Sequence, residues 1–99
     1  MPVVTLDSSF AMKIGFTSNK FTQVSYLWRK GKIIIISFIE SHIQGMGFFT
    51  GLLRSIEEVG YTVSVPTPFP QMERILVKRG FHKKMMNDKV FGEVEVWEK

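Results

Sequence analysis

Two glycines and a glutamine at the start of a predicted helix are the residues whose types and spacing could hold a ligand. Gln44, Gly45 and Gly47 follow a strongly apolar run, residues 33–39, and precede residues with helical periodicity. Glycine lets a ligand approach the backbone, and the unpaired amides of a first helical turn offer donors and partial positive charge. The segment predicts a place for a phosphate-bearing ligand. The alternative is that the glycines serve only the turn and the packing of the helix on the sheet.

The composition excludes several other kinds of site and indicates the charge of a partner. The chain has 99 residues and no cysteine, which excludes a disulfide framework, a thiolate zinc site and a thiol nucleophile. Its two histidines, His42 and His82, are isolated, so no metal site is expected. Thirteen Lys and Arg against nine Asp and Glu give a formal charge of +4, which favours a polyanionic partner such as a phosphorylated cofactor or nucleic acid.

The chain shows no signal for a membrane or for export. Its apolar runs are too short to span a bilayer, and its start lacks a basic region followed by an apolar core. We therefore expect a cytoplasmic protein with no membrane partner.

The periodicities predict one α/β (α+β) domain over residues 1–99. Alternation or continuous β-branched residues predict strands, and apolar residues three and four apart predict helices. The predicted strands are residues 12–16, 22–28, 33–39, 61–65 and 91–97. The first predicted helix carries Met46, Phe49, Leu52, Leu53, Ile56 and Val59 and ends at Gly60; the second runs from Pro70 to Gly80. The order β-β-β-α-β-α-β implies a mixed, mainly antiparallel sheet with two main helices packed on it, and the last strand at or near an edge.

Several of these segments together resemble the GNAT family of acyl-CoA-dependent N-acyltransferases. In that family a strand leads into a loop and helix with the pattern Gln or Arg, two variable residues, Gly, one variable residue, and Gly or Ala. Gln44 and Gly47 match the first and fourth positions, and Phe49 stands at the last. Leu52-Leu53 match the paired aliphatic residues that follow, and Gly80-Phe81 match a later signature. The resemblance covers roughly residues 22–97.

The resemblance implies acetyl-CoA as co-substrate and an amine as acceptor. The cofactor would contact residues at the strand end and in the pyrophosphate loop: Ile39, Gln44, Gly45, Met46, Gly47, Phe48 and Phe49. Direct attack of the amine on the thioester needs a base, and Glu40 at the end of the apolar strand or His42 two residues on is placed to serve. The alternatives are that Glu40 is a solvated charge at a strand end and that His42 is a polar loop residue.

Two other classes of function stay open. Leu76 stands where the family commonly has a Tyr that protonates the leaving thiolate, and roughly Phe69 stands at the usual Asn, which favours a non-catalytic GNAT-fold protein acting through a protein partner. A basic turn at residues 29–32, a second cluster at residues 78–84 and the aromatic residues Tyr26, Trp28 and Trp97 are the features a nucleic-acid-binding protein would use. The strand edges of so small a sheet would also allow a homodimer.

Overall fold

The computed structural model describes residues 2–90 and 92–99, and these fall into two compact units. The first unit ends at Val63 and the second is Ser64–Lys99. The boundary lies within strand β4 (Thr62–Pro66). Each unit is described below by itself. The expectation of a single domain over the whole chain stays a prediction.

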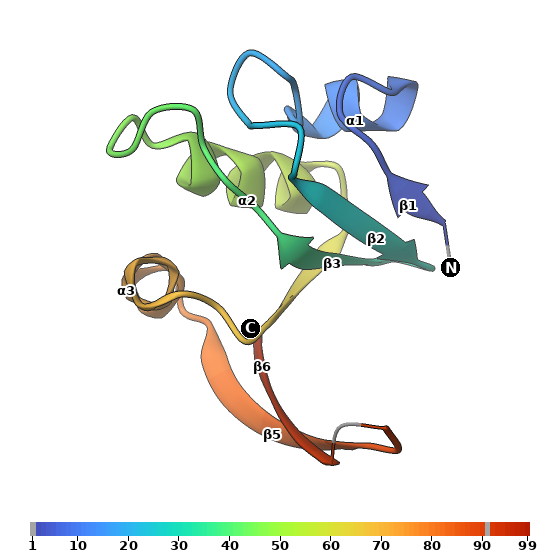
Figure 1. The fold of residues 1–99 in the computed structure, drawn as a ribbon, viewed down its shortest axis with the longest axis vertical. Coiled ribbons are helices and arrows are strands. Elements are labelled where there is room, and N and C mark those ends of the chain that lie inside the picture. Colours follow the sequence, from blue (N-terminus) through green and yellow to red (C-terminus); the bar gives the residue numbers. More distant parts are fainter. Residues whose placement is uncertain (1, 91) are drawn as a thin grey trace. The chain divides into compact units, whose positions relative to one another are not determined.

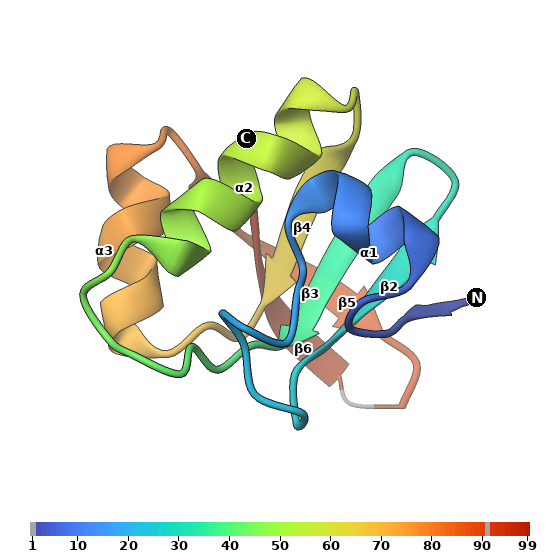
Figure 2. The ribbon, with the colours of Figure 1, turned by 90° about the horizontal axis from the view of Figure 1, so that it is seen from above.

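The first unit is a small antiparallel sheet with two helices on one face (Figures 1 and 2). Its strands are β1 (Val3–Val4), β2 (Tyr26–Lys30) and β3 (Ile33–Phe38), and its helices are α1 (Ser9–Ile14) and α2 (Phe48–Glu58). β2 pairs antiparallel with both β1 and β3. The loop between β3 and α2 holds the predicted ligand segment.

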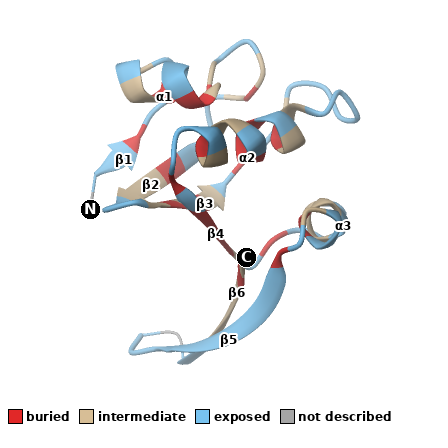
Figure 3. Ribbon diagram, turned by 180° about the vertical axis from the view of Figure 1, so that it is seen from behind, coloured by how far each residue is buried: buried red, intermediate tan, exposed pale blue. Residues whose placement is uncertain are grey.

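The core of this unit lies between the helices and the sheet, as the buried residues in Figure 3 show. Every second residue of the strands points inward, and the inward side chains of α1 and α2 recur three or four residues apart. Burial removes each of these apolar side chains from water, which contributes about 1.5–3 kcal/mol apiece before the entropy cost of ordering. The buried residues include Leu27, Ile34, Ile36, Ala11, Ile14, Phe49, Leu52, Leu53, Ile56, Phe16 and Phe21.

Only one face of β3 is fully buried. Ile34 and Ile36 are buried, whereas Ile33 and Ile35 are half-buried. β2 begins at Tyr26 rather than at residue 22, because residues 22–25 form a turn closed by the Ser25 N–H donating to the Thr22 carbonyl at 3.0 Å.

The predicted strand at residues 12–16 is wrong, because most of this segment belongs to helix α1. The Ser8 side chain caps the helix by accepting a hydrogen bond from the Ala11 N–H at 3.2 Å, and Gly15 ends it with φ of 77°. Ala11 and Ile14, three residues apart, are the buried pair. A helix of six residues gives too few apolar repeats to show its period against a strand of similar length.

The second unit holds a β-hairpin and one helix. Its elements are the end of β4, α3 (Pro70–Lys78), β5 (His82–Asp88) and β6 (Gly92–Glu98). β6 pairs antiparallel with β4 on one side and with β5 on the other. Val65, Leu76, Phe81 and Trp97 are its buried apolar side chains.

The helix beginning at Pro70 and ending before Gly80 is confirmed. β5 was missed, and the predicted strand at residues 91–97 is confirmed from Gly92 on, while Phe91 lies outside the described residues. β6 has neighbours on both sides, so β5 rather than β6 lies at the sheet edge. The mixed α+β class with a mainly antiparallel sheet is confirmed, but the element order differs, because α1 replaces a strand, and β1 and β5 are additional. None of the described helices is long and apolar enough to cross a membrane.

Candidate functional site

After β3, the backbone of Glu40 is held by hydrogen bonds to the buried hydroxyl of Ser25. Ile39 is buried, so it contributes to the core at the strand end. The Glu40 N–H donates to Ser25 Oγ at 2.9 Å, and the Ser25 hydroxyl donates to the Glu40 carbonyl at 3.3 Å. Because Ser25 is itself buried, this pair of bonds fixes the backbone of Glu40 against the turn before β2.

The Glu40 side chain is exposed and carries one recorded hydrogen bond. Its Oε1 accepts from the Thr22 hydroxyl at 2.9 Å. A carboxylate has about four acceptor positions, so one bond from a threonine leaves it able to accept a proton or a further donor. Glu40 is thus a positioned carboxylate rather than a freely rotating one.

His42 is exposed and is held by the same loop. Its backbone N–H donates to the Lys20 carbonyl at 2.9 Å, and its ring Nε2 lies 2.8 Å from the Ser18 carbonyl oxygen. A carbonyl oxygen only accepts, so Nε2 must carry a proton in this bond. The lone pair of a neutral His42 ring is therefore on Nδ1, and any base chemistry of this residue would use that atom.

The glycine-containing loop is open to solvent. Gln44, Gly45, Met46 and Gly47 are all exposed. Gly45 and Gly47 have φ of 80° and 76°, and a Cβ built on either would meet no heavy atom within 4 Å. Glycine is used here for its backbone conformation and not for close packing of the helix on the sheet.

Helix α2 begins without a side-chain cap. Gly47 occupies the N-cap position, so no side chain accepts a hydrogen bond from the first-turn amides. These amides belong to Phe48, Phe49 and Thr50, and they leave partial positive charge at the exposed loop. An anion placed there would meet N–H donors rather than side chains.

The two aromatic residues of this turn point away from the loop. Phe49 is buried in the core of the first unit, and Phe48 packs its ring against Phe21 with 6.4 Å between centroids. Met46 was expected on the apolar face of the helix and instead lies before it, 60% exposed. The loop surface therefore consists of backbone with the side chains of Gln44 and Met46.

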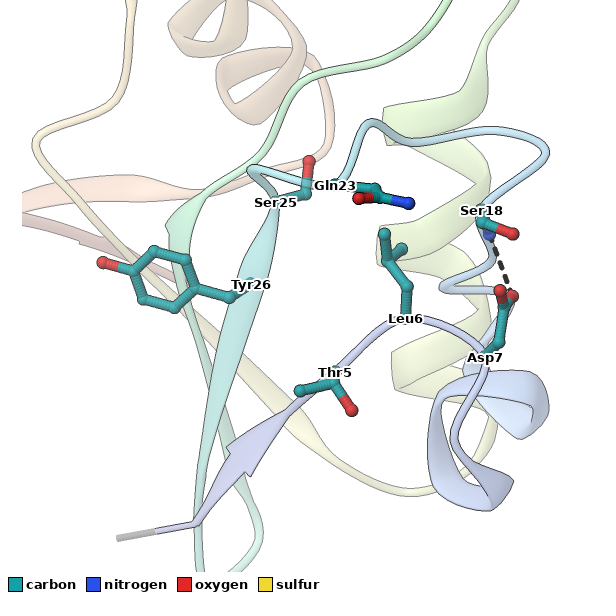
Figure 4. A pocket seen from close by; sticks show the side chains of 7 residues that line it. All are labelled: Thr5, Leu6, Asp7, Ser18, Gln23, Ser25 and Tyr26. Atoms are coloured by element: carbon teal, nitrogen blue, oxygen red, sulfur yellow. Dashed lines mark hydrogen bonds between the residues drawn. The ribbon is translucent and has the colours of Figure 1, made fainter.

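A second feature of the first unit, missed from the sequence, is a pocket of about 430 Å³ (Figure 4). It is lined by Thr5, Leu6, Asp7, Ser18, Gln23, Ser25 and Tyr26. Asp7 has φ of 64°, a left-handed conformation that Asp adopts more readily than most residues, and its Oδ1 accepts from the Ser18 N–H at 2.9 Å. Hydrogen bonds from the Ser18 side chain and then its backbone lower the pKa of Asp7, with burial opposing them weakly.

The basic turn at residues 29–32, which a nucleic-acid-binding protein would use, contacts aromatic rings in this structure. The Arg29 guanidinium lies 4.6 Å from the Phe10 centroid and 5.1 Å from that of Tyr61, and the Lys32 ammonium lies 4.7 Å from Tyr61. Trp97, one of the proposed stacking residues, is buried, and its indole N–H donates to Glu95. The Tyr26 and Trp28 rings pack edge to face at 6.1 Å.

In the second unit, Leu76 is fully buried and Phe69 is exposed at the N-cap position of α3. Neither side chain can donate a proton. No group of three or more His, Cys, Asp or Glu side chains in residues 2–90 and 92–99 is arranged to hold a metal ion. Comparisons with protein-family models, curated proteins and solved structures return no match.

Proposed function

We propose that the loop at residues 44–47 and the first turn of α2 bind the pyrophosphate of an acyl-CoA thioester, and that the protein transfers the acyl group, most simply acetyl, to an amine. The observation that carries this proposal is the exposed, uncapped start of α2 behind two glycines of positive φ. No side chain caps the three first-turn amides, and the loop before them is exposed. This is the arrangement that anions bind at helix N-termini.

The position of Phe49 supports the same proposal. A bulky residue at this place in the GNAT-like pattern would obstruct a cofactor if its ring pointed into the loop. The ring is buried beneath α2, so its size does not reach the loop surface. The strand–helix–strand–helix sequence from β3 to α3 is also the order expected of a GNAT-like chain.

The transfer itself needs only one protein base. The amine nitrogen, once deprotonated, attacks the thioester carbonyl carbon, and the C–S bond breaks as the C–N bond forms. Glu40 takes the proton from the ammonium, since its carboxylate is exposed and held by Thr22. With Leu76 buried and unable to act as an acid, the CoA thiolate takes up, through water, the second proton that the nitrogen loses as the amide forms.

Leu76 also favours the second candidate, a protein that binds CoA or a protein partner without catalysis. The two candidates make the same binding prediction and differ in turnover. Binding and transfer therefore have to be measured separately.

Binding is tested by amide chemical-shift changes on titration with CoA and with pantetheine, which lacks the pyrophosphate. We expect CoA, but not pantetheine, to change the chemical shifts of the Phe48, Phe49 and Thr50 amides. The matched variants are Thr50→Glu and Thr50→Gln. A glutamate in the first turn suits the helix dipole but repels a pyrophosphate, so Thr50→Glu should weaken CoA binding by about fivefold or more while the fold is kept. Equal affinity in the two variants would contradict the proposed site.

Transfer is tested by release of free thiol from acetyl-CoA in the presence of a panel of primary amines. Glu40→Gln should lower kcat by about 10²-fold or more with CoA affinity unchanged. CoA binding without thiol release for any amine would support the non-catalytic candidate instead.

A further inference from the structure

The pocket in Figure 4 is a concave feature of the first unit that the proposed function does not yet use. It lies between the segment after β1 and the loop that precedes β2. Its volume, about 430 Å³, is within the range of small-molecule sites. Its walls come from Thr5 to Asp7 on one side and from Ser18 to Tyr26 on the other.

The pocket has an acidic character in a protein of net charge +4. Asp7 is the charged residue among the seven that line it, and none of the seven is Lys, Arg or His. Within residues 2–90 and 92–99, the bonds recorded for the Asp7 carboxylate come from Ser18, and no cation lies within ion-pair distance of it. Because those bonds favour the ionised form, the carboxylate is charged at neutral pH.

The lining residues include both polar and apolar groups, with Leu6 as the aliphatic one. Figure 4 shows the Asp7 carboxylate beside Ser18, Leu6 pointing between the two walls toward Gln23, and Tyr26 on the side away from Asp7 with its hydroxyl directed outward. A ligand with a cationic end near Asp7 would lay its body over Leu6. Hydroxyl and amide groups of Ser18 and Gln23 can accept hydrogen bonds from the same cation.

We propose that this pocket binds a small primary amine, as its ammonium ion, with the charge at Asp7 and a short apolar body along Leu6. An alkyl or arylalkyl amine has this chemistry. A neutral or anionic molecule of the same shape lacks the pairing with Asp7.

One hydrogen-bonded connection links the pocket to the candidate base. Ser25 lines the pocket and its hydroxyl bonds the backbone N–H and carbonyl of Glu40. The amine would therefore be bound next to the segment that carries Glu40. We further infer that this amine is the acyl acceptor, and this part of the proposal rests on the proposed function. The binding of the amine does not depend on it.

The test is a titration followed by amide chemical shifts in the absence of CoA, with 2-phenylethylamine and its neutral counterpart 2-phenylethanol. We expect saturable shifts at Asp7, Ser18 and Gln23 with the amine, and affinity at least about threefold lower for the alcohol. Equal shifts and affinities for the two molecules would overturn the proposal.

Two variants move the charge in opposite directions. Asp7→Asn keeps the left-handed backbone and an acceptor for Ser18 but removes the charge, so amine binding should weaken by about threefold or more. Gln23→Glu adds a carboxylate to the pocket wall and should strengthen amine binding. Glu58→Gln, on an exposed residue at the end of α2 outside the pocket, is the matched charge control and should leave the affinity unchanged. If Asp7→Asn and Glu58→Gln behave alike, the pocket is not the binding site.

The outcomes separate this proposal from the proposed function. Amine binding without CoA binding would keep the pocket and remove the acyltransferase. CoA binding and thiol release without amine binding at Asp7 would keep the acyltransferase and remove the pocket. If Asp7→Asn disturbs the whole spectrum, the Gln23→Glu and alcohol comparisons still decide the result.

Discussion

Strands β3 and β5 have similar lengths and opposite environments. β3 pairs with β2, and its Ile34 and Ile36 are buried under the helices of the first unit. β5 pairs with β6 along its whole length, from His82 opposite Glu98 to Asp88 opposite Gly92, yet every residue of β5 is exposed. A strand can thus be specified by burial of one face or by a hairpin's cross-strand pairs alone. The difference implies that truncating the buried side chains of β3 costs far more stability than truncating side chains of β5.

The largest expected contrast is between two apolar truncations. Ile34→Ala removes buried methylene and methyl groups from the core and should lower the free energy of unfolding by about 2–5 kcal/mol. Met85→Ala removes a side chain that is 56% exposed and should change it by about 0.5 kcal/mol or less. Urea denaturation of both variants measures the two values. Comparable losses would mean that β5 is covered by a partner in solution.

Removing a polar group should also cost more stability in the first unit than in β5, but the difference should be smaller than for the apolar truncations. Ser25→Ala leaves the partly buried N–H of Glu40 without its acceptor and should cost about 1–3 kcal/mol. Lys84→Ala removes an exposed ion pair with Glu98, 3.4 Å between charged atoms, and should cost about 0.5 kcal/mol or less. The same denaturation experiment applies, and a larger cost for Lys84→Ala would contradict the comparison.

Two glycines near the start of α2 should respond in opposite directions. Gly47→Ala places a Cβ on a backbone with φ of 76° and should destabilise by about 1 kcal/mol. Gly51→Ala lies in the helix interior with open space around its Cβ and should stabilise by about 0.5–1 kcal/mol. Thermal midpoints of the two variants should therefore fall on either side of the parent.

The smallest expected effect is a pH dependence at Asp7. Because hydrogen bonds from Ser18 lower the pKa of Asp7 below its ordinary 3.8, the ionised group favours the folded state above that pH. This contribution is lost as the pH falls through the folded-state pKa. The difference in thermal midpoint between the parent and Asp7→Asn should shrink between pH 6 and strongly acidic pH. A difference that grows on acidification would contradict the assignment of the shift.

The sequence predicted the elements whose periodicity is long or bounded by clear signals. The β-branched run at residues 33–36 marked β3, and Pro70 and Gly80 marked the limits of α3. α1 was missed because its buried face has two residues, and β5 because Lys83 and Lys84 give its alternation no apolar side. Both elements depend on their neighbours more than on their own composition.

The candidate site divides in the same way. The loop at residues 44–47 was identified because its glycines lie between an apolar strand and a helix in the sequence. Helical spacing left the direction of the Phe49 ring open, and the structure buries it. The exposure of Met46 was not expected, since the helix begins later than the pattern indicates. The Asp7 pocket could not be predicted, because its lining residues, 5–26, meet only once α1 and the following loop are folded.

The thermal midpoint with and without CoA and acetyl-CoA, each in excess and at two salt concentrations, tests the central claim most directly. A ligand that binds only the folded state must raise the midpoint by mass action. We predict a saturable rise with both compounds at both salt concentrations, reduced in Thr50→Glu and kept in Thr50→Gln. An unchanged midpoint with either ligand would contradict CoA binding at the start of α2.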